Sequence, residues 1–266
     1  MPPSRPLLVA NGPVNWTREL NALAAAAEPL LAADGGANHL GRIGLRPAAV
    51  VGDLDSITSG VRAFVGENRM VHRPDQDRTD LDKALEYAFH ELGLDRLTVL
   101  GATGGRLDHA SGNLGLLARL AMGEGLEYLD PGNRLVAVAG EIALSAVPGE
   151  TWSFFTFDPA VRVSLEGVKW PVTDVALDLP GKPSISNVAA ADEVTVRAQG
   201  GAVIVMRWFN PTFSPISYCG RRCTAPRRAF SVRGAHLGAI AERGKPRSGA
   251  SERTVTHRPR RDSGRA

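Results

Sequence analysis

Short apolar runs that alternate with helix-forming stretches fill the first half of the chain and constrain its fold more than any other feature. The runs read as strands at residues 6–10, 29–33, 48–51, 69–72, 97–100 and 126–129. Periodicity and capping residues predict helices at 16–27, 37–43, 81–92 and 107–121. Strands that alternate with helices favour a mostly parallel sheet covered by helices on both faces. We therefore expect a three-layer α/β domain.

The pattern changes near residue 132. The segments that follow are short and rich in β-forming residues: 134–139, 142–147, 151–157, 161–165, 193–198 and 202–207. Gly, Pro and Asp punctuate them without helical periodicity, which is typical of a small antiparallel sandwich or barrel. We predict an α/β domain over residues 1–131 and a smaller all-β sandwich domain over 132–208.

The last segment, residues 209–266, differs from both domains in charge. It contains 13 Lys and Arg but only 3 Asp and Glu, so the chain's net charge of +3 comes from this segment. Its hydrophobic periodicity fades, and such a composition favours disorder. We expect a disordered basic extension. Nucleic-acid binding by this extension stays an alternative, with an affinity that would fall steeply with salt, although no aromatic interleaving supports it.

Hydropathy and cysteine usage bear on the cellular location. No apolar run approaches the roughly 20 residues that span a bilayer. Cys219 and Cys223 are too few for a disulfide framework, and no second Cys/His pair accompanies them as in a zinc finger. A cytoplasmic location is the default expectation.

Acidic loops follow several of the expected strands, at the edge where open parallel sheets bind ligands. Asp53 and Asp55 lie two residues apart, so in an extended segment both side chains point the same way. Asp80 could add a third oxygen, although an aspartate there also suits a helix cap. Convergent carboxylates repel one another unless a cation lies between them, and Mg²⁺ bound with a polyphosphate meets that need. We predict a metal site of Asp53, Asp55 and Asp80.

A glycine-rich loop, residues 101–106, joins the fifth expected strand to the next helix. Its backbone N–H groups and the helix N-terminus would form an anion cradle, and Arg106 adds a fork of phosphate donors. No Gly-Lys-Ser/Thr follows, so this is not a Walker loop, and such turns are also common packing devices. Beside the acidic loops, it indicates a nucleotide polyphosphate.

Isolated residues carry less information. Lys83 is expected to be a solvated charge, one turn into its helix. Trp152, Trp170 and Trp208 are expected in the core or at an interface, where any of them could also stack on an aromatic substrate.

Five motifs, taken in order, resemble the thiamine pyrophosphokinase family. They are Asp34-Gly-Gly-Ala-Asn38, Gly52-Asp-Leu-Asp-Ser56, Asp75-Gln-Asp-Arg-Thr-Asp80, Gly101-Ala-Thr-Gly-Gly-Arg-Leu-Asp-His109, and Gly167-Val-Lys-Trp-Pro-Val-Thr-Asp174 with Ser184-Ile-Ser-Asn187. The resemblance covers residues 5 to 208. Each motif alone is modest, but five in this order are highly specific.

The resemblance implies an enzyme that transfers pyrophosphate from ATP to the hydroxyl of thiamine, with Mg²⁺ as cofactor. It also implies a homodimer, in which the first domain binds nucleotide and the second contributes to thiamine binding. Catalysis would fall to Asp34, Asp53, Asp55 and Asp80, the last three as metal ligands. The nucleotide would contact Gln76, Thr79, Thr103, Gly104, Arg106 and Asp108. The substrate side would be lined by Asp34, Asn38, Ser186 and Asn187. Either Asp34 or Asp55 would accept the hydroxyl proton.

Two other functions stay open. The chain could be a pyrophosphokinase that acts on a different alcohol, such as a pterin, or a non-catalytic sensor of thiamine or a nucleotide. An assay of AMP release across a panel of alcohols separates the enzymes from one another. A sensor would not need its metal carboxylates, and this chain retains all three.

Removal of residues 209–266 is expected to leave activity unchanged, because the family resemblance ends near Arg207. The rate of AMP release by a chain that ends at residue 208 measures this directly. A large loss of rate would show that the basic extension contributes to function.

Overall fold

The computed structural model describes residues 5–130 and 132–208. The expectations for residues 209–266, including Cys219 and Cys223, lie outside this part of the chain. Among the described residues, no helix combines the length and the apolar character that crossing a membrane requires.

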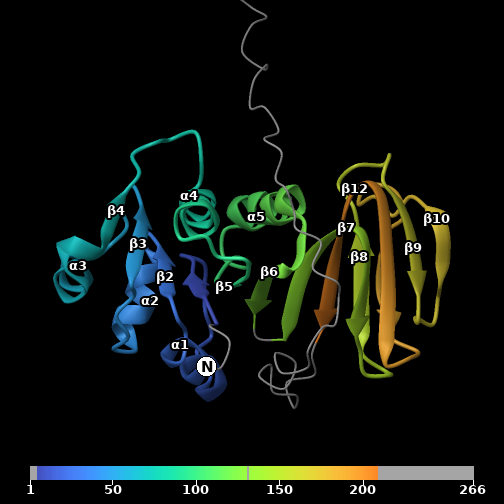
Figure 1. Ribbon diagram of the computed structural model, residues 1–266, viewed down its shortest axis with the longest axis horizontal. Coiled ribbons are helices and arrows are strands. Elements are labelled where there is room, and N and C mark those ends of the chain that lie inside the picture. The colour runs from blue at the N-terminus through green and yellow to red at the C-terminus, as the bar shows by residue number, and fades with distance from the viewer. Residues whose placement is uncertain (1–4, 131, 209–266) are drawn as a thin grey trace, which may run out of the picture. The chain divides into compact units, whose positions relative to one another are not determined.

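Strands and helices alternate in the first half, as the sequence predicts (Figure 1). The strands are β1 (Leu7–Val9), β2 (Leu30–Ala33), β3 (Ala49–Gly52), β4 (Met70–His72), β5 (Leu97–Leu100) and β6 (Met122–Asp130). The helices are α1 (Arg18–Ala25), α2 (Gly36–Arg42), α3 (Ser59–Val65), α4 (Asp80–Glu86) and α5 (Leu107–Leu120), with a 3₁₀ turn at Glu67–Arg69 and a π-helical turn at Tyr87–Glu91. Helix α3 was not predicted; it is short and buries little apart from Val65.

The second half is built from strands alone. They are β7 (Asn133–Ser145), β8 (Thr151–Phe155), β9 (Arg162–Glu166), β10 (Val172–Val175), β11 (Ser184–Val188) and β12 (Glu193–Trp208). Strands β10 and β11 were not predicted, because they are short and largely exposed.

Six parallel strands form the first part of the sheet, in the order β4-β3-β2-β1-β5-β6. The chain moves outward from β1 to β4 and then returns to the other side of β1 with β5. The strand order therefore reverses between β1 and β5, which is where open parallel sheets bind ligands. All six carboxyl ends lie at one edge, so the loops that follow these strands share that edge.

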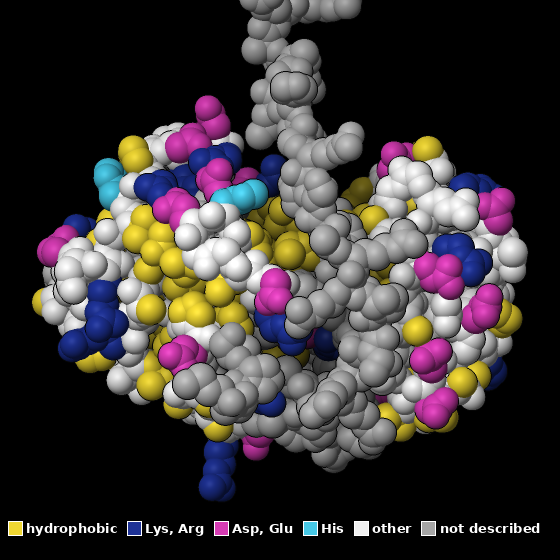
Figure 2. Space-filling model, in the orientation of Figure 1, with side chains coloured by type: hydrophobic (Ala, Val, Ile, Leu, Met, Phe, Trp, Pro, Cys, Tyr) yellow, Lys and Arg dark blue, Asp and Glu magenta, His cyan; other side chains and the backbone are white. Residues whose placement is uncertain are grey.

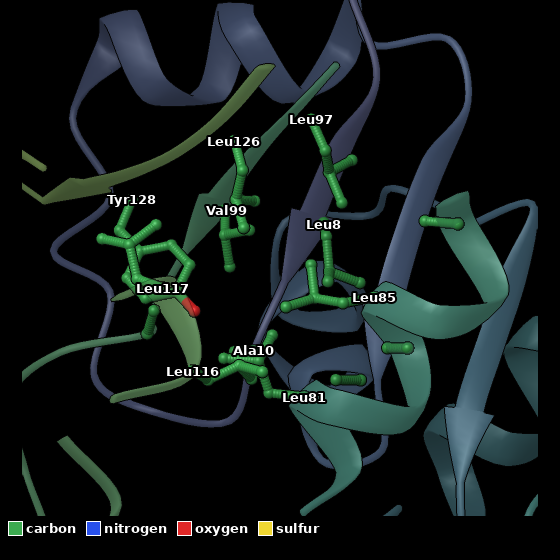
Figure 3. Packing of buried hydrophobic residues seen from close by; sticks show 14 of the residues in the cluster. Leu8, Ala10, Leu81, Leu85, Leu97, Val99, Leu116, Leu117, Leu126 and Tyr128 are labelled. Atoms are coloured by element: carbon green, nitrogen blue, oxygen red, sulfur yellow. The ribbon is translucent and has the colours of Figure 1, made fainter. Parts of the chain in front are cut away.

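Helices cover both faces of the parallel strands, which confirms the three-layer arrangement. On one face, Leu85 of α4 and Leu117 of α5 are buried with Leu8 and Val99 of the sheet (Figure 3). On the opposite face, α1, α2 and α3 supply a second cluster, which includes Leu20, Leu40 and Val65. Strands buried on both faces explain the continuous apolar runs in the sequence.

Two long strands carry the sheet into the β-rich half. β7 pairs with β6 and with the whole of β12, and β12 pairs in turn with β8 and β9. The prediction that each of these strands is divided in two, at Gly140 and at Gly200, is wrong. Both glycines have positive φ, and the β7–β12 register shifts between Ala198 and Ala202, so the glycines mark an irregularity within paired strands and not a connection between strands.

The β-rich half has a hydrophobic core of its own, in which Trp152, Phe154, Val163 and Val196 are fully buried. The sandwich form of this half stays a prediction. The confirmed architecture is thus an α/β sheet followed by a β-rich part. The described strands nevertheless join into a single 12-stranded sheet, and Ile204 of β12 belongs to the same core cluster as Leu117. Separate domains over 1–131 and 132–208 stay a prediction.

Two leucines of α5 give a matched test of this packing. Leu117 is fully buried, whereas Leu107 is 78% exposed. Leu117→Ala should lower the free energy of unfolding by about 2–5 kcal/mol, because it leaves a cavity between α5 and the sheet. Leu107→Ala should change the same quantity by less than about 0.5 kcal/mol. Urea denaturation measures both, and equal losses would contradict the placement of α5.

Candidate active site

Three carboxylates from separate loops meet at the carboxyl edge of the sheet. Asp34 follows β2, Asp53 follows β3, and Asp80 begins α4. One carboxylate oxygen of each lies within 4.8 Å of the other two. Acidic and basic side chains gather on this side of the molecule, around α4 and the loop that precedes it (Figure 2). Separate chain segments therefore create a concentration of negative charge that none of them has alone.

Gly52 makes this approach possible. A Cβ atom at this position would lie 2.8 Å from the Cβ of Asp34 and 3.0 Å from Oδ1 of Asp80. Real Cβ atoms do not approach other atoms so closely, so any side chain here would push the two aspartates apart. The glycine at the end of β3 is therefore part of the site.

Asp34 is the most buried of the three, with 2% of its surface exposed and a positive φ of 40°. Burial raises the pKa of its carboxyl group, while the Ser56 side chain and the Gly35 backbone N–H oppose this shift. The charges of Asp80 and Asp55 raise the pKa further. Its Oδ1 atom has no hydrogen-bond partner among the described residues. A buried carboxylate oxygen without a donor suits either a cation or a proton.

Asp80 is held by a buried lysine. Its Oδ1 accepts hydrogen bonds from Lys83 Nζ at 3.1 Å and from the Asp53 backbone N–H at 3.2 Å. Lys83 is only 2% exposed, so the expectation of a solvated charge was wrong. The side chain lies three residues beyond Asp80 in α4, a spacing that places both on one helix face. This spacing was the signal that sequence analysis could have used.

Asp53 is held by the loop that precedes α4. Gln76 Nε2 donates to Asp53 Oδ2 at 3.1 Å, and this hydrogen bond is the main reason that the pKa of Asp53 is lowered. The loop itself is tied down by Arg78, which donates to Asp75 at 2.8 Å and to Glu86 of α4 at 2.6 Å. Thr79 caps α4 by accepting from the Asp82 N–H. Arg78 was not singled out from the sequence.

Asp55 and Asn38 lie nearby but have other contacts. Asp55 is exposed, accepts from the Ser56 hydroxyl at 2.8 Å and is not one of the three close carboxylates. Asn38 donates to the Ser56 carbonyl at 2.9 Å and accepts from the Thr58 N–H at 3.0 Å. Both ends of the Asn38 amide therefore fasten the loop after β3. Metal binding by Asp55 and substrate binding by Asn38 stay predictions.

The glycine-rich loop lies at the point where the strand order reverses. Gly12, just after β1, donates its N–H to the carbonyl of Gly101 at 3.0 Å. Gly104 and Gly105 have φ values of 79° and 63°, which residues with side chains rarely adopt. The buried Thr103 Oγ1 has no partner among the described residues. The loop thus places backbone, together with a buried hydroxyl that lacks a partner, at the expected ligand position. The part played by Gly12 was not predicted.

Arg106 and Asp108 are exposed and form an ion pair with each other. The hydrogen bond from Arg106 is the main reason that the pKa of Asp108 is lowered to about 2. In the part of the chain that the structure describes, neither forms an ion pair or a hydrogen bond with Asp34, Asp53 or Asp80, the three carboxylates called the acidic group below. Arg106 is therefore exposed at the end of the loop, where an anion can compete for it.

The predicted substrate residues of the β-rich half have structural contacts of their own. Asn187 is buried, donates to the Trp170 carbonyl at 2.9 Å and accepts from the Trp170 N–H at 3.2 Å. Ser186 is exposed and has a φ of 57°. Trp152 is buried as expected, whereas Trp170 and Trp208 are 54% and 50% exposed. For the residues described, no hydrogen bond or ion pair joins Ser186 or Asn187 to the acidic group.

Comparisons with known proteins agree on one family. A family model described as the catalytic domain of thiamin pyrophosphokinase matches residues 20–127, and a model described as its vitamin B1 binding domain matches residues 141–203. The thiamine pyrophosphokinase of Bacillus subtilis is 28% identical over 207 residues, which cover 75% of this chain and 96% of that protein. Thiamine pyrophosphokinase 2 of Arabidopsis thaliana is 28% identical over 206 residues, covering 63% and 73%.

A solved structure gives the same result. The structure of thiamine pyrophosphokinase from Bacillus subtilis has a TM-score of 0.66 and 27% identity, and the match covers 78% of this chain and 100% of that one.

Gly52→Ala tests the packing of the carboxylates. The new methyl group should displace Asp34 and Asp80. The affinity for Mn²⁺, used here as a probe in place of Mg²⁺, should then fall by about tenfold or more, because loss of the groups that orient metal ligands has an effect of this size. Gly60→Ala is the matched control, because a Cβ there meets nothing within 4 Å. Isothermal titration measures both affinities. An unchanged affinity in Gly52→Ala would show that these carboxylates do not bind the ion together.

Proposed function

The chain belongs to the thiamin pyrophosphokinase family, and we propose that the acidic edge of its sheet is where the reaction of that family takes place. The chain is a thiamine diphosphokinase: it transfers pyrophosphate from ATP to the hydroxyl of thiamine, giving thiamine diphosphate and AMP. Neither a pterin-like alcohol as substrate nor a sensor role gains support. The observation that carries the assignment to this edge is the approach of Asp34, Asp53 and Asp80.

Asp53, Asp80 and Asp34 would hold Mg²⁺. Their carboxylate oxygens are hard ligands of the kind that Mg²⁺ prefers, and one ammonium, that of Lys83, does not balance three carboxylates. The buried Oδ1 of Asp34 also lacks a donor in the described structure. Asp55 remains a further candidate ligand, since its side chain is exposed and lies two residues beyond Asp53. When bound, Mg²⁺ would neutralise charge on the phosphate oxygens.

The proton acceptor would be Asp34 or Asp55. In the reaction, the thiamine oxygen bonds to the β-phosphorus of ATP, the bond from that phosphorus to the oxygen of the α-phosphate breaks, and the hydroxyl proton must leave. Burial raises the pKa of Asp34 and makes its carboxylate more basic than an ordinary aspartate, whereas Mg²⁺ bound to the same carboxylate would oppose that shift. Asp55 is exposed and already accepts a hydrogen bond from Ser56.

The glycine-rich loop would position the triphosphate. Thr103 offers a free hydroxyl, Gly104 lets backbone come close, and Arg106 can exchange its exposed partner Asp108 for phosphate oxygens. Gln76 and Thr79 would act from the other side, Gln76 beside Asp53 and Thr79 through the cap of α4. Transfers of this type depend mainly on alignment and charge neutralisation, which such a frame supplies.

Asn38, Ser186 and Asn187 would line the thiamine side of the site. The protein would act as a homodimer, and it would do so in the cytoplasm. Trp170, half exposed and held by Asn187, supports this, because an exposed aromatic surface suits a partner or an aromatic substrate. A monomer by sedimentation at micromolar concentration would contradict the dimer.

Incubation with ATP, Mg²⁺ and thiamine tests the proposal, with AMP and thiamine diphosphate measured together. Asp53→Asn and Asp55→Asn should each abolish turnover without unfolding the chain, because Asp53 belongs to the close carboxylate group and Asp55 is a further candidate ligand. Asp95→Asn is the matched control, since Asp95 precedes β5 at the opposite edge of the sheet. Near-normal AMP release by Asp53→Asn or Asp55→Asn would refute the metal role of that residue.

A further inference from the structure

One more carboxylate stands at the same edge of the sheet, away from the acidic group. Asp130 is the last residue of β6, which runs parallel to β5. The register pairs Leu129 with Leu100, so Asp130 lies beside Gly101, where the glycine-rich loop begins. The end of β6 therefore adjoins the loop proposed to bind phosphates.

Among the described residues, no cation pairs with the Asp130 side chain, which distinguishes it from two other loop carboxylates at this edge. Asp75 and Asp108 are each paired with an arginine. In the described part of the chain, the Asp130 carboxylate has neither a hydrogen bond nor an ion pair, and burial alone raises the pKa of this carboxyl group to about 6. A desolvated carboxylate without donors carries a free-energy cost. A ligand that donates hydrogen bonds to this carboxylate would remove that cost.

The order of secondary-structure elements from β5 to β6 is the one found in dinucleotide-binding sheets. It consists of a strand, a glycine-rich turn, a helix and an adjacent parallel strand with an acidic residue at its end. In dinucleotide-binding sheets, this unit places phosphates at the turn, while the acidic residue accepts hydrogen bonds from a ribose hydroxyl. The loop here is not the G-x-G-x-x-G fingerprint. The correspondence lies in the topology and in the place of Asp130.

The position of Asp130 along the sheet fits a nucleoside and not a phosphate. From β3, which precedes Asp53, the sheet continues through β2, β1 and β5 to β6. Four strand spacings of about 4.8 Å separate the two ends, roughly 19 Å. A triphosphate held near Asp53 can therefore cross the switch point while its ribose reaches β6. Direct contact between Asp130 and phosphate oxygens would be repulsive, so the uncharged diol is the matching group.

We infer that Asp130 binds the ribose of ATP, with its carboxylate accepting hydrogen bonds from the 2′- and 3′-hydroxyls. This inference rests on the proposed function, in which the glycine-rich loop holds the triphosphate. It gives Asp130 a role in selecting the nucleotide and leaves proton transfer to the acidic group. Triphosphates that lack both hydroxyls should bind less tightly than ATP.

Equilibrium binding of ATP and of 2′,3′-dideoxy-ATP to the full chain tests the inference without requiring turnover. The wild type should prefer ATP by about tenfold, the expected effect of hydrogen bonds to a charged group. Asp130→Ala should weaken ATP binding by about the same factor, leave dideoxy-ATP binding nearly unchanged, and so abolish the preference. Asp95→Ala, at the opposite edge, should behave like the wild type.

Two results would overturn the inference. If Asp130→Ala weakened the binding of both triphosphates equally, the role of Asp130 would be structural, and thermal unfolding of the variant would show the cause. If the wild type bound both triphosphates equally, no residue would form energetically significant hydrogen bonds with the ribose hydroxyls. The kinase assignment is judged separately by AMP release, so a wild type that selects ATP but releases no AMP would contradict the proposed function alone.

Discussion

Mutual repulsion among three closely placed carboxylates is the constraint on which this site depends. Asp34, Asp53 and Asp80 come from three separate loops, and in water such groups would move apart. The sheet prevents this, because each aspartate is fixed at the end of a buried strand or at the start of a helix that packs on that sheet. Gly52 removes the atom that would stand between them, and Lys83 offsets part of the charge. The remaining imbalance is what a divalent ion and a polyphosphate would relieve.

The same sheet connects the ligand-binding edge of the parallel strands to the β-rich half of the chain. Its parallel strands direct their loops to a single edge, and reversal of the order at β1 opens that edge between the acidic loops and the glycine-rich loop. Beyond β6, the long strands β7 and β12 continue the hydrogen bonding into the β-rich half. Ile204 and Leu117 share one core cluster, so the two halves pack as a continuous unit.

Much of this arrangement could be predicted from sequence, because strands buried on both faces and helices with one apolar face leave clear periodic patterns. The acidic loops were found for the same reason, since they follow those strands directly. The exchange of Asp34 for Asp55 in the close group was not predictable, because it depends on a backbone with positive φ and on side-chain rotation. Lys83 was misjudged because burial depends on how α4 packs. Gly140 and Gly200 resembled turns because a glycine within a paired strand and a glycine in a connection look alike in sequence.

Diffraction from crystals grown with Mn²⁺ and a non-hydrolysable ATP analogue tests the central claim most directly. The anomalous signal of the metal reports its position independently of any assumed mechanism. We expect Mn²⁺ between the carboxylates of Asp34, Asp53 and Asp80 and in contact with the triphosphate. A triphosphate bound in the crystal with its metal elsewhere, and with these three carboxylates turned away from it, would show that they do not form the metal site.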